Sequence, residues 1–329
     1  MEKTLSPECI RITEDAAIAC ARLMGKGDRN EADQLATQAM RKTMDDIDMC
    51  GTIVIGEGER DKAPMLYIGE KVGRFKEGNQ SLHWPEIDIA VDPLEGTNLV
   101  ATGQSNAITV LAASEKGGLM HAPDTYLNKL CVGPTSAGKV DINLEPKENL
   151  SRIAKALKRE INDLTVVILD RPRHKELINQ VRAAGARIKL IGDGDLSAAI
   201  SCAIRGTNIH AVMGIGGAPE GVLAAAALKC LGGEIQAKFC FRNDEEKQRA
   251  LKMGHDNLDK VFYTHDLAPG ENIVFACTGV TTGDLLTGIR YFGGGARTHS
   301  LVMSYQSRIF RLVDTVHMFD KNREAPIIL

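Results

Sequence analysis

Four apolar segments of this chain each run into a turn that combines glycine with aspartate or glutamate. The turns lie at residues 56–61, 92–97, 192–195 and 214–221. Ligands of open α/β sheets bind beyond the carboxyl ends of the strands, and glycine lets the backbone approach a ligand closely. Any one of these turns alone is ordinary, since Asp193 and Asp195 also suit a turn followed by a helix N-cap. Together the turns predict one acidic site at the edge of a sheet.

Apolar periodicity predicts the elements that carry these turns. Helices are expected in the segment that ends at Met24 and over 30–47, with Asp28 as the N-cap of the second helix. Strands are expected at 52–55, 87–91, 107–113, 164–169, 187–191, 209–213 and 272–276. Further helices are expected at 173–184, 196–204, 221–231 and 283–289. This alternation predicts an α/β fold with a parallel or mostly parallel sheet, divided near residue 160 into 1–160 and 161–329.

Charge and composition exclude several classes of function. The chain has 40 Lys and Arg against 43 Asp and Glu, a formal net charge of −3, and only 4% aromatic residues. A nucleic-acid-binding protein would need a basic stripe or stacking aromatic residues. The longest uncharged run, 96–114, contains polar side chains that are costly in lipid, and acidic residues near the N-terminus argue against a signal peptide. We therefore expect a cytoplasmic protein that binds neither nucleic acid nor membrane.

The acidic turns need a compensating positive charge. Converging carboxylates repel one another, and a divalent cation is the simplest relief. Because the turns offer oxygen ligands without a matching set of histidine or cysteine, Mg²⁺ or Mn²⁺ is favoured over Zn²⁺.

Two further features suit a phosphate group. Arg171, Pro172 and Arg173 follow an expected strand, and two arginines beside a rigid proline can bind phosphate through paired hydrogen bonds. The same segment also fits solvated surface charge. Gly96 and Gly217 offer backbone N–H groups near expected helix starts. The glycines at 214–217 lack the GxGxxG spacing, which argues against a dinucleotide-dependent dehydrogenase.

Residues 92–97, Asp-Pro-Leu-Glu-Gly-Thr, resemble a motif of the metal-dependent, lithium-sensitive phosphatase superfamily. A wider set of segments resembles the class II fructose-1,6-bisphosphatases of the GlpX type, at 25–33, 51–73, 88–97, 122–126, 170–174, 193–195 and 214–221. Further segments resemble more closely the branch that hydrolyses both fructose 1,6- and sedoheptulose 1,7-bisphosphate, at 1–5, 170–178, 201–216 and 313–320. The similarity runs through nearly the whole chain.

This resemblance implies the layered α/β/α/β/α fold of that superfamily. It implies metal-dependent hydrolysis of the 1-phosphate of fructose 1,6-bisphosphate, and of sedoheptulose 1,7-bisphosphate, in gluconeogenesis or the Calvin cycle. It also implies Mg²⁺ or Mn²⁺ as the cofactor and a homotetramer as the assembly. Two alternatives stay open: an inositol monophosphatase-like or 3′-phosphonucleotide phosphatase of the same superfamily, and a non-catalytic module whose acidic turns hold a structural cation.

Carried onto this chain, the resemblance implies metal ligands at Asp33, Glu57, Asp92, Glu95 and Glu220. It implies substrate contacts at Glu95, Gly96, Thr97, Tyr126, Arg171, Pro172, Arg173, Asp193, Gly194, Asp195 and Gly217. It assigns the attacking water to Thr97, with Glu59 and Asp61 nearby. A threonine hydroxyl is a poor base alone, so this role needs a cation or one of those carboxylates. Arg29 and Arg171 stand where other members often carry lysine, and residues 240–260 look shorter than in many relatives.

Overall fold

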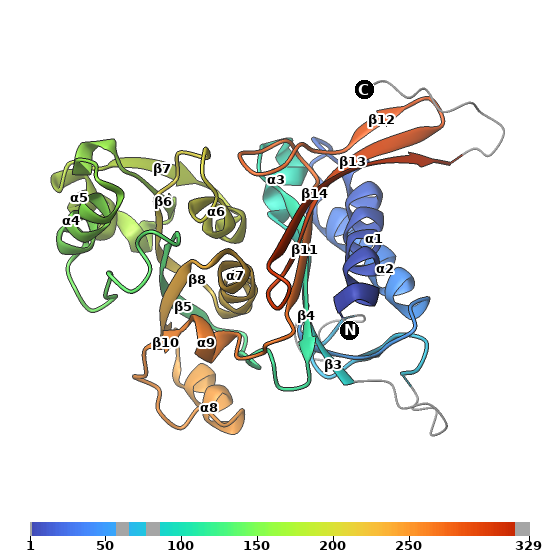
Figure 1. Cartoon of the computed structure of the whole chain (residues 1–329), viewed down its shortest axis with the longest axis horizontal. Coiled ribbons are helices and arrows are strands. Elements are labelled where there is room, and N and C mark those ends of the chain that lie inside the picture. The colour runs from blue at the N-terminus through green and yellow to red at the C-terminus, as the bar shows by residue number, and fades with distance from the viewer. Residues whose placement is uncertain (1, 57–65, 77–85, 320–329) are drawn as a thin grey trace.

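The computed structural model describes residues 2–56, 66–76 and 86–319, and their strands form two sheets (Figure 1). The strands of the first sheet are β1 (Cys50–Ile55), β2 (Lys71–Val72), β3 (Glu86–Glu95), β4 (Ile108–Glu115), β11 (Val274–Gly279), β12 (Arg290–Phe292), β13 (Gly295–Ser304) and β14 (Ile309–Met318). The strands of the second sheet are β5 (Tyr126–Val132), β6 (Thr165–Leu169), β7 (Arg187–Ile191), β8 (Ala211–Gly217), β9 (Glu234–Cys240) and β10 (Phe262–Tyr263). Their orders are β12-β13-β11-β4-β3-β1-β2, with β14 paired to β13, and β10-β9-β5-β8-β6-β7.

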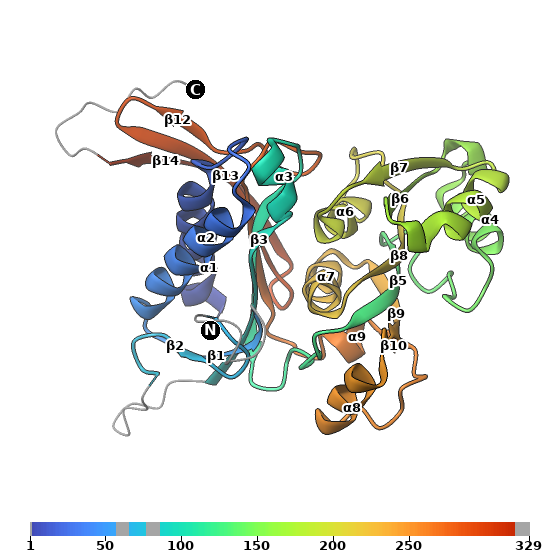
Figure 2. The ribbon, with the colours of Figure 1, turned by 180° about the vertical axis from the view of Figure 1, so that it is seen from behind.

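Helices cover the outer faces of both sheets and fill the space between them (Figures 1 and 2). The α-helices are α1 (Glu2–Ala21), α2 (Arg29–Asp45), α3 (Thr97–Thr102), α4 (Pro146–Leu157), α5 (Lys175–Ala183), α6 (Asp195–Cys202), α7 (Ala218–Leu231), α8 (Asp244–Lys252) and α9 (Thr264–Leu267). Helices α1 and α2 lie on the outer face of the first sheet, α6 and α7 between the sheets, and α4 and α5 on the outer face of the second. This is the expected order of five layers.

The two N-terminal helices are confirmed, and Asp28 caps the second one. Its side chain accepts a hydrogen bond from the backbone N–H of Glu31 at 2.9 Å. Such a bond satisfies an N–H group that has no partner within the helix. Cap and periodicity are local signals, so the sequence reports them directly.

The expectation of a mostly parallel sheet is wrong. Among the described strands, only the pairs β1–β3, β6–β7 and β6–β8 are parallel, and the other nine pairs are antiparallel. The chain leaves the first sheet after β4, builds the second sheet, and returns at β11 to pair antiparallel with β4. Alternation of strand and helix predicts layers, but these long-range returns decide strand direction.

The helix expected at 283–289 is also wrong, because this segment is irregular in the structure. Its glycines lie directly against other backbone and side-chain atoms. A Cβ atom on Gly283 would lie 2.3 Å from Oδ1 of Asn106, and one on Gly288 would lie 2.6 Å from the backbone N of Thr282. This segment connects β11 to the strands β12, β13 and β14, none of which was expected.

The two sheets do not follow the division expected near residue 160. Strand β5 lies before residue 160 but belongs to the second sheet, and β11 to β14 lie after residue 160 but belong to the first. The division into 1–160 and 161–329 stays a prediction about domains, and the sheets follow a different partition.

Within the described residues, no helix has both the length and the apolar character to cross a membrane.

Helix α7 is the central buried element of the fold. The helix carries buried apolar side chains around its whole circumference. Among them are Val222, Leu223 and Leu228, each 0% exposed. A helix that is apolar all round must be covered on all sides, and here the two sheets cover it (Figure 1). The helix begins after Gly217 and ends at Leu231, and the φ of 72° at the following Gly232 suits a residue without Cβ.

We expect the substitution Leu228→Ala to lower the free energy of unfolding by about 2–5 kcal/mol, because it removes buried methyl groups and leaves a cavity. Equilibrium denaturation followed by circular dichroism measures the change. The matched control is Leu251→Ala on exposed α8, for which we expect a change within about 0.5 kcal/mol. Equal effects of the two substitutions would contradict the central role of α7.

Candidate active site

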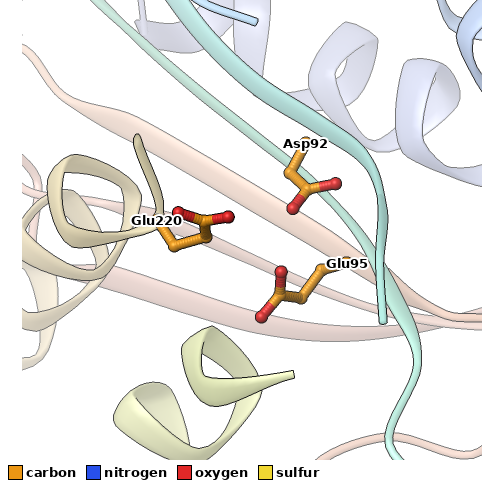
Figure 3. Close-up of side chains that lie close together, drawn as sticks. All are labelled: Asp92, Glu95 and Glu220. Atoms are coloured by element: carbon orange, nitrogen blue, oxygen red, sulfur yellow. The ribbon is translucent and has the colours of Figure 1, made fainter. Parts of the chain in front are cut away.

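Three carboxylates from two elements lie together between the first sheet and α7 (Figure 3). Asp92 and Glu95 come from the end of β3, and Glu220 comes from the first turn of α7. One oxygen of each carboxylate lies within 4.8 Å of the oxygens of the other two. Strand β3 continues through Asp92 and Glu95 with a break in its register against β4, so these residues lie in a distorted strand and not in the expected turn.

Burial raises the pKa of all three carboxyl groups. Loss of solvent raises the pKa of Asp92 to about 6 and that of Glu220 to about 7, and it raises the pKa of Glu95 well above its usual value. The negative charges of neighbouring carboxylates add to each shift, whereas Lys129 opposes the shift at Glu220. The ionised cluster therefore needs a positive charge in its midst.

The residues present fit a hard divalent cation. Oε2 of Glu220 is buried and accepts no hydrogen bond from any described residue. Gly217 leaves room for this oxygen, because a Cβ atom at that position would lie 1.8 Å from it. A cluster made only of carboxylate oxygens suits cations such as Mg²⁺ or Mn²⁺. The orphaned oxygen and the donor set together identify a possible metal-binding cluster.

The cluster lines a cavity of about 320 Å³ together with other residues of the expected site. Asp33 on α2 lines this cavity, although it lies outside the close group of three, and burial raises its pKa. Gly96, Thr97 and Asp193 also line the cavity. Thr97 is the first residue of α3 and is half-buried. Three of the expected residues, Glu57, Glu59 and Asp61, lie outside the described residues.

A second cavity of about 250 Å³ adjoins the first. The two cavities share several wall residues, namely Glu95, Asp124, Asp193, Pro219 and Glu220. At its other end the second cavity is lined by Tyr126, Arg171, Arg173 and Arg242. One cleft therefore has an acidic end and a cationic end.

The residues between these two ends hold one another in place. Nδ2 of Asn98 donates to Oδ2 of Asp193 at 2.9 Å, and the backbone N of Leu196 donates to Oε1 of Glu95 at 3.0 Å. Gly194, Asp195 and Gly217 line the second cavity. Pro172 starts a short 3₁₀ turn, η2 (Pro172–His174), and lines neither cavity.

Sequence reasoning missed two residues that line this cleft, Asp124 and Arg242, and a third, Lys129, that pairs with the wall residue Asp195. Lys129 on β5 is 4% exposed, and its Nζ lies 2.6 Å from Oδ2 of Asp195. A charged residue in a mostly apolar strand was a usable signal for it, because a lysine is rarely buried without a partner. Asp124 lies beside the predicted Tyr126 and lines both cavities. Arg242 carried no signal, because nothing local distinguishes it from a surface charge.

This chain is similar to known proteins over almost its whole length. A family model described as "Bacterial fructose-1,6-bisphosphatase, glpX-encoded" matches residues 3–317. A protein of Synechococcus elongatus is 54% identical in an alignment 337 positions long, which covers 97% of this chain and 98% of the relative. A protein of Synechocystis is 53% identical in an alignment 346 positions long, which covers 100% of this chain and 99% of the relative. Both relatives are named D-fructose 1,6-bisphosphatase class 2/sedoheptulose 1,7-bisphosphatase.

We expect Mn²⁺ to bind at least about tenfold more weakly at about pH 5.5 than at about pH 8, because protons compete for the carboxylates. The affinity for Mn²⁺ falls as the pH falls because burial raises the pKa of Asp92 to about 6 and that of Glu220 to about 7. Below these values the groups hold protons that a cation must displace. Isothermal titration calorimetry in two buffers of different ionisation enthalpy measures both the affinity and the released protons.

The matched control for this experiment is Glu148→Gln, whose side chain is exposed on α4. This variant should bind Mn²⁺ as the unaltered chain does. Equal affinity of the unaltered chain at both pH values, without proton release, would contradict a cation site made of these carboxylates.

Proposed function

Because the chain belongs to the family of glpX-encoded bacterial fructose-1,6-bisphosphatases, we propose that it hydrolyses the 1-phosphate of fructose 1,6-bisphosphate. We propose the same reaction with sedoheptulose 1,7-bisphosphate, the second substrate in the names of the cyanobacterial relatives. The observation that carries the proposal is the single cleft with a carboxylate cluster at one end and arginines at the other. A sugar with a phosphate at each end would place one phosphate at the carboxylate end, beside the cation, and the other phosphate at the arginine end.

The acidic end would hold the cofactor, Mg²⁺ or Mn²⁺. The ligands we propose are Asp33, Glu57, Asp92, Glu95 and Glu220. When bound, such a cation supplies positive charge to the reacting phosphate and lowers the pKa of a water molecule. Support comes from the orphaned oxygen of Glu220 and from the close approach of three carboxylates.

The chain's own groups would orient the water and the reacting phosphate. Thr97, at the start of α3 in the wall of the acidic cavity, would hold the attacking water. A carboxylate at Glu59 or Asp61 would take the proton that a hydroxyl group alone cannot accept. The backbone N–H groups of Gly96 and Gly217 would contact phosphate oxygens.

The rest of the cleft would position the substrate. Asp193, Gly194 and Asp195 would face the sugar, and the two carboxylates would accept hydrogen bonds from its hydroxyl groups. Arg171 and Arg173 would hold the distal phosphate together with Tyr126, and Pro172 would fix the backbone between the two arginines. Binding of this non-reacting end fixes the position of the reacting end, which lowers the entropic cost of reaction.

Four wider expectations, on superfamily, location, assembly and domains, belong to the same proposal. The five-layered fold would be that of the lithium-sensitive phosphatase superfamily. The working protein would be a cytoplasmic homotetramer, and its domains would divide near residue 160. An inositol monophosphatase-like or 3′-phosphonucleotide phosphatase is the alternative, but an arginine-lined second cavity favours a substrate with a second phosphate.

We expect the purified chain to release inorganic phosphate from both sugar bisphosphates in the presence of Mg²⁺ or Mn²⁺. Chelation should abolish the release, and Glu220→Gln should lower it by at least about a hundredfold, because a charge that holds the cation is lost. The control Glu148→Gln should retain full activity. Hydrolysis of inositol monophosphate or a 3′-phosphonucleotide in place of the sugar bisphosphates would refute the proposed function.

Thr97→Ala should lower kcat by about 10²–10⁴-fold while KM changes little, because the hydroxyl group acts on the water and not on the bound substrate. Steady-state kinetics with fructose 1,6-bisphosphate measures both constants. Thr102→Ala, at the exposed far end of the same helix, is the matched control and should leave them unchanged. A near-normal kcat for Thr97→Ala would remove the hydroxyl group from the mechanism.

A further inference from the structure

A third arginine, Arg242, lies beside the two that the sequence singled out. Cys240 on β9 pairs with Tyr126 on β5, and Arg242 follows just beyond the end of β9. The Cζ atom of Arg242 lies 4.8 Å from the centre of the Tyr126 ring, and that of Arg173 lies 4.9 Å from it. Both distances suit cation–π contacts. The tyrosine ring therefore brings two guanidinium groups together in the wall of one cavity.

The position of Arg242 is fixed by a buried carboxylate. Nε of Arg242 donates to Oε1 of Glu246, and its backbone N donates to Oε2 of the same residue at 2.9 Å. Glu246 is 3% exposed and also accepts a hydrogen bond from the hydroxyl of Thr125 at 2.7 Å. This anchor uses only Nε of the guanidinium group. Its two terminal nitrogens donate to no acceptor in the described part of the chain.

Arg171 and Arg173 are anchored in the same one-sided manner. Nη1 of Arg171 donates to the carbonyl oxygen of Asp170 at 3.0 Å. Nε and Nη2 of Arg173 donate to the carbonyl oxygen of Ile215 at 3.3 and 2.8 Å. Carbonyl groups carry no net charge, and among the described residues neither arginine forms an ion pair. Glu246 thus pairs with Arg242, whereas Arg171 and Arg173 have no carboxylate partner among the described residues, so their remaining N–H groups suit an anion.

We propose that Arg242 completes a three-arginine clamp that binds the distal phosphate of the sugar bisphosphate and sets the preference for bisphosphates over monophosphates. The inference rests on the proposed function and extends it by one residue that neither motif nor composition identified. A phosphate dianion carries enough oxygens for several guanidinium groups. Because Glu246 and Tyr126 hold Arg242 in place beforehand, little side-chain entropy is lost on binding.

The test compares substrates that differ only in the distal phosphate. Arg242→Gln should raise KM for fructose 1,6-bisphosphate roughly tenfold to hundredfold, since hydrogen bonds between charged groups are lost. Its effect on kcat/KM for fructose 1-phosphate should be much smaller. Arg242→Lys, which keeps the charge without the planar fork, should give an intermediate KM. The matched control Lys252→Gln removes one exposed positive charge from α8 and should change neither substrate's kinetics.

A direct binding measurement separates this inference from the proposed function. The affinity for fructose 6-phosphate, measured by calorimetry, should fall in Arg242→Gln by the same factor as the rise in KM. An unchanged KM for the bisphosphate, or equal losses with both substrates, would overturn the clamp. If the unaltered chain hydrolyses no sugar bisphosphate, the proposed function fails, and the fructose 6-phosphate titrations still decide whether Arg242 binds the phosphate.

Discussion

The burial of three carboxylates beside one another is the constraint on which the rest of this site depends. Asp92, Glu95 and Glu220 repel one another at close range and have lost most of their contact with water. Desolvation of unpaired charges is costly, and a buried charge persists only if it is paired or neutralised. Lys129 forms its ion pair with Asp195 and leaves Glu220 with an oxygen that has no partner among the described residues. A bound cation would offset both the mutual repulsion of the ionised carboxylates and the cost of their desolvation.

Apolar packing supplies the free energy that holds these charges together. Helix α7 lies in a core that contains residues of both sheets, including Val54 and Ile55 of β1 and Leu127 of β5. This packing fixes the N-terminal turn of α7, and with it Glu220, near Asp92 and Glu95 at the end of β3 (Figure 3). The same turn follows Gly217, whose missing side chain makes room for the carboxylate. The free energy gained by burying apolar side chains around α7 thus outweighs the electrostatic cost of bringing three carboxylates together in the site.

Sequence reasoning succeeded where the signal was local. The cap at Asp28, the strand before Asp92 and the Ala-rich helix expected at 221–231 each follow from spacing within a few residues, although that helix already begins at Ala218. It failed for strand direction and for the segment 283–289, whose backbone packs tightly against Asn106. Both errors have one physical cause, since each outcome depends on contacts between segments far apart in the chain. Tertiary contacts of this kind routinely override local propensity.

The sequence by itself determined the chemical character of the site: acidic groups beside glycines, a threonine at a helix start, and a pair of arginines after a strand. It did so because glycine, proline and charged residues have strong effects on their immediate surroundings. Only the tertiary structure decided that Glu220 meets Asp92 and Glu95, that Lys129 is buried beside Asp195, and that Arg242 joins the two predicted arginines. Distances across the fold depend on how whole layers pack, and no short stretch of residues encodes them.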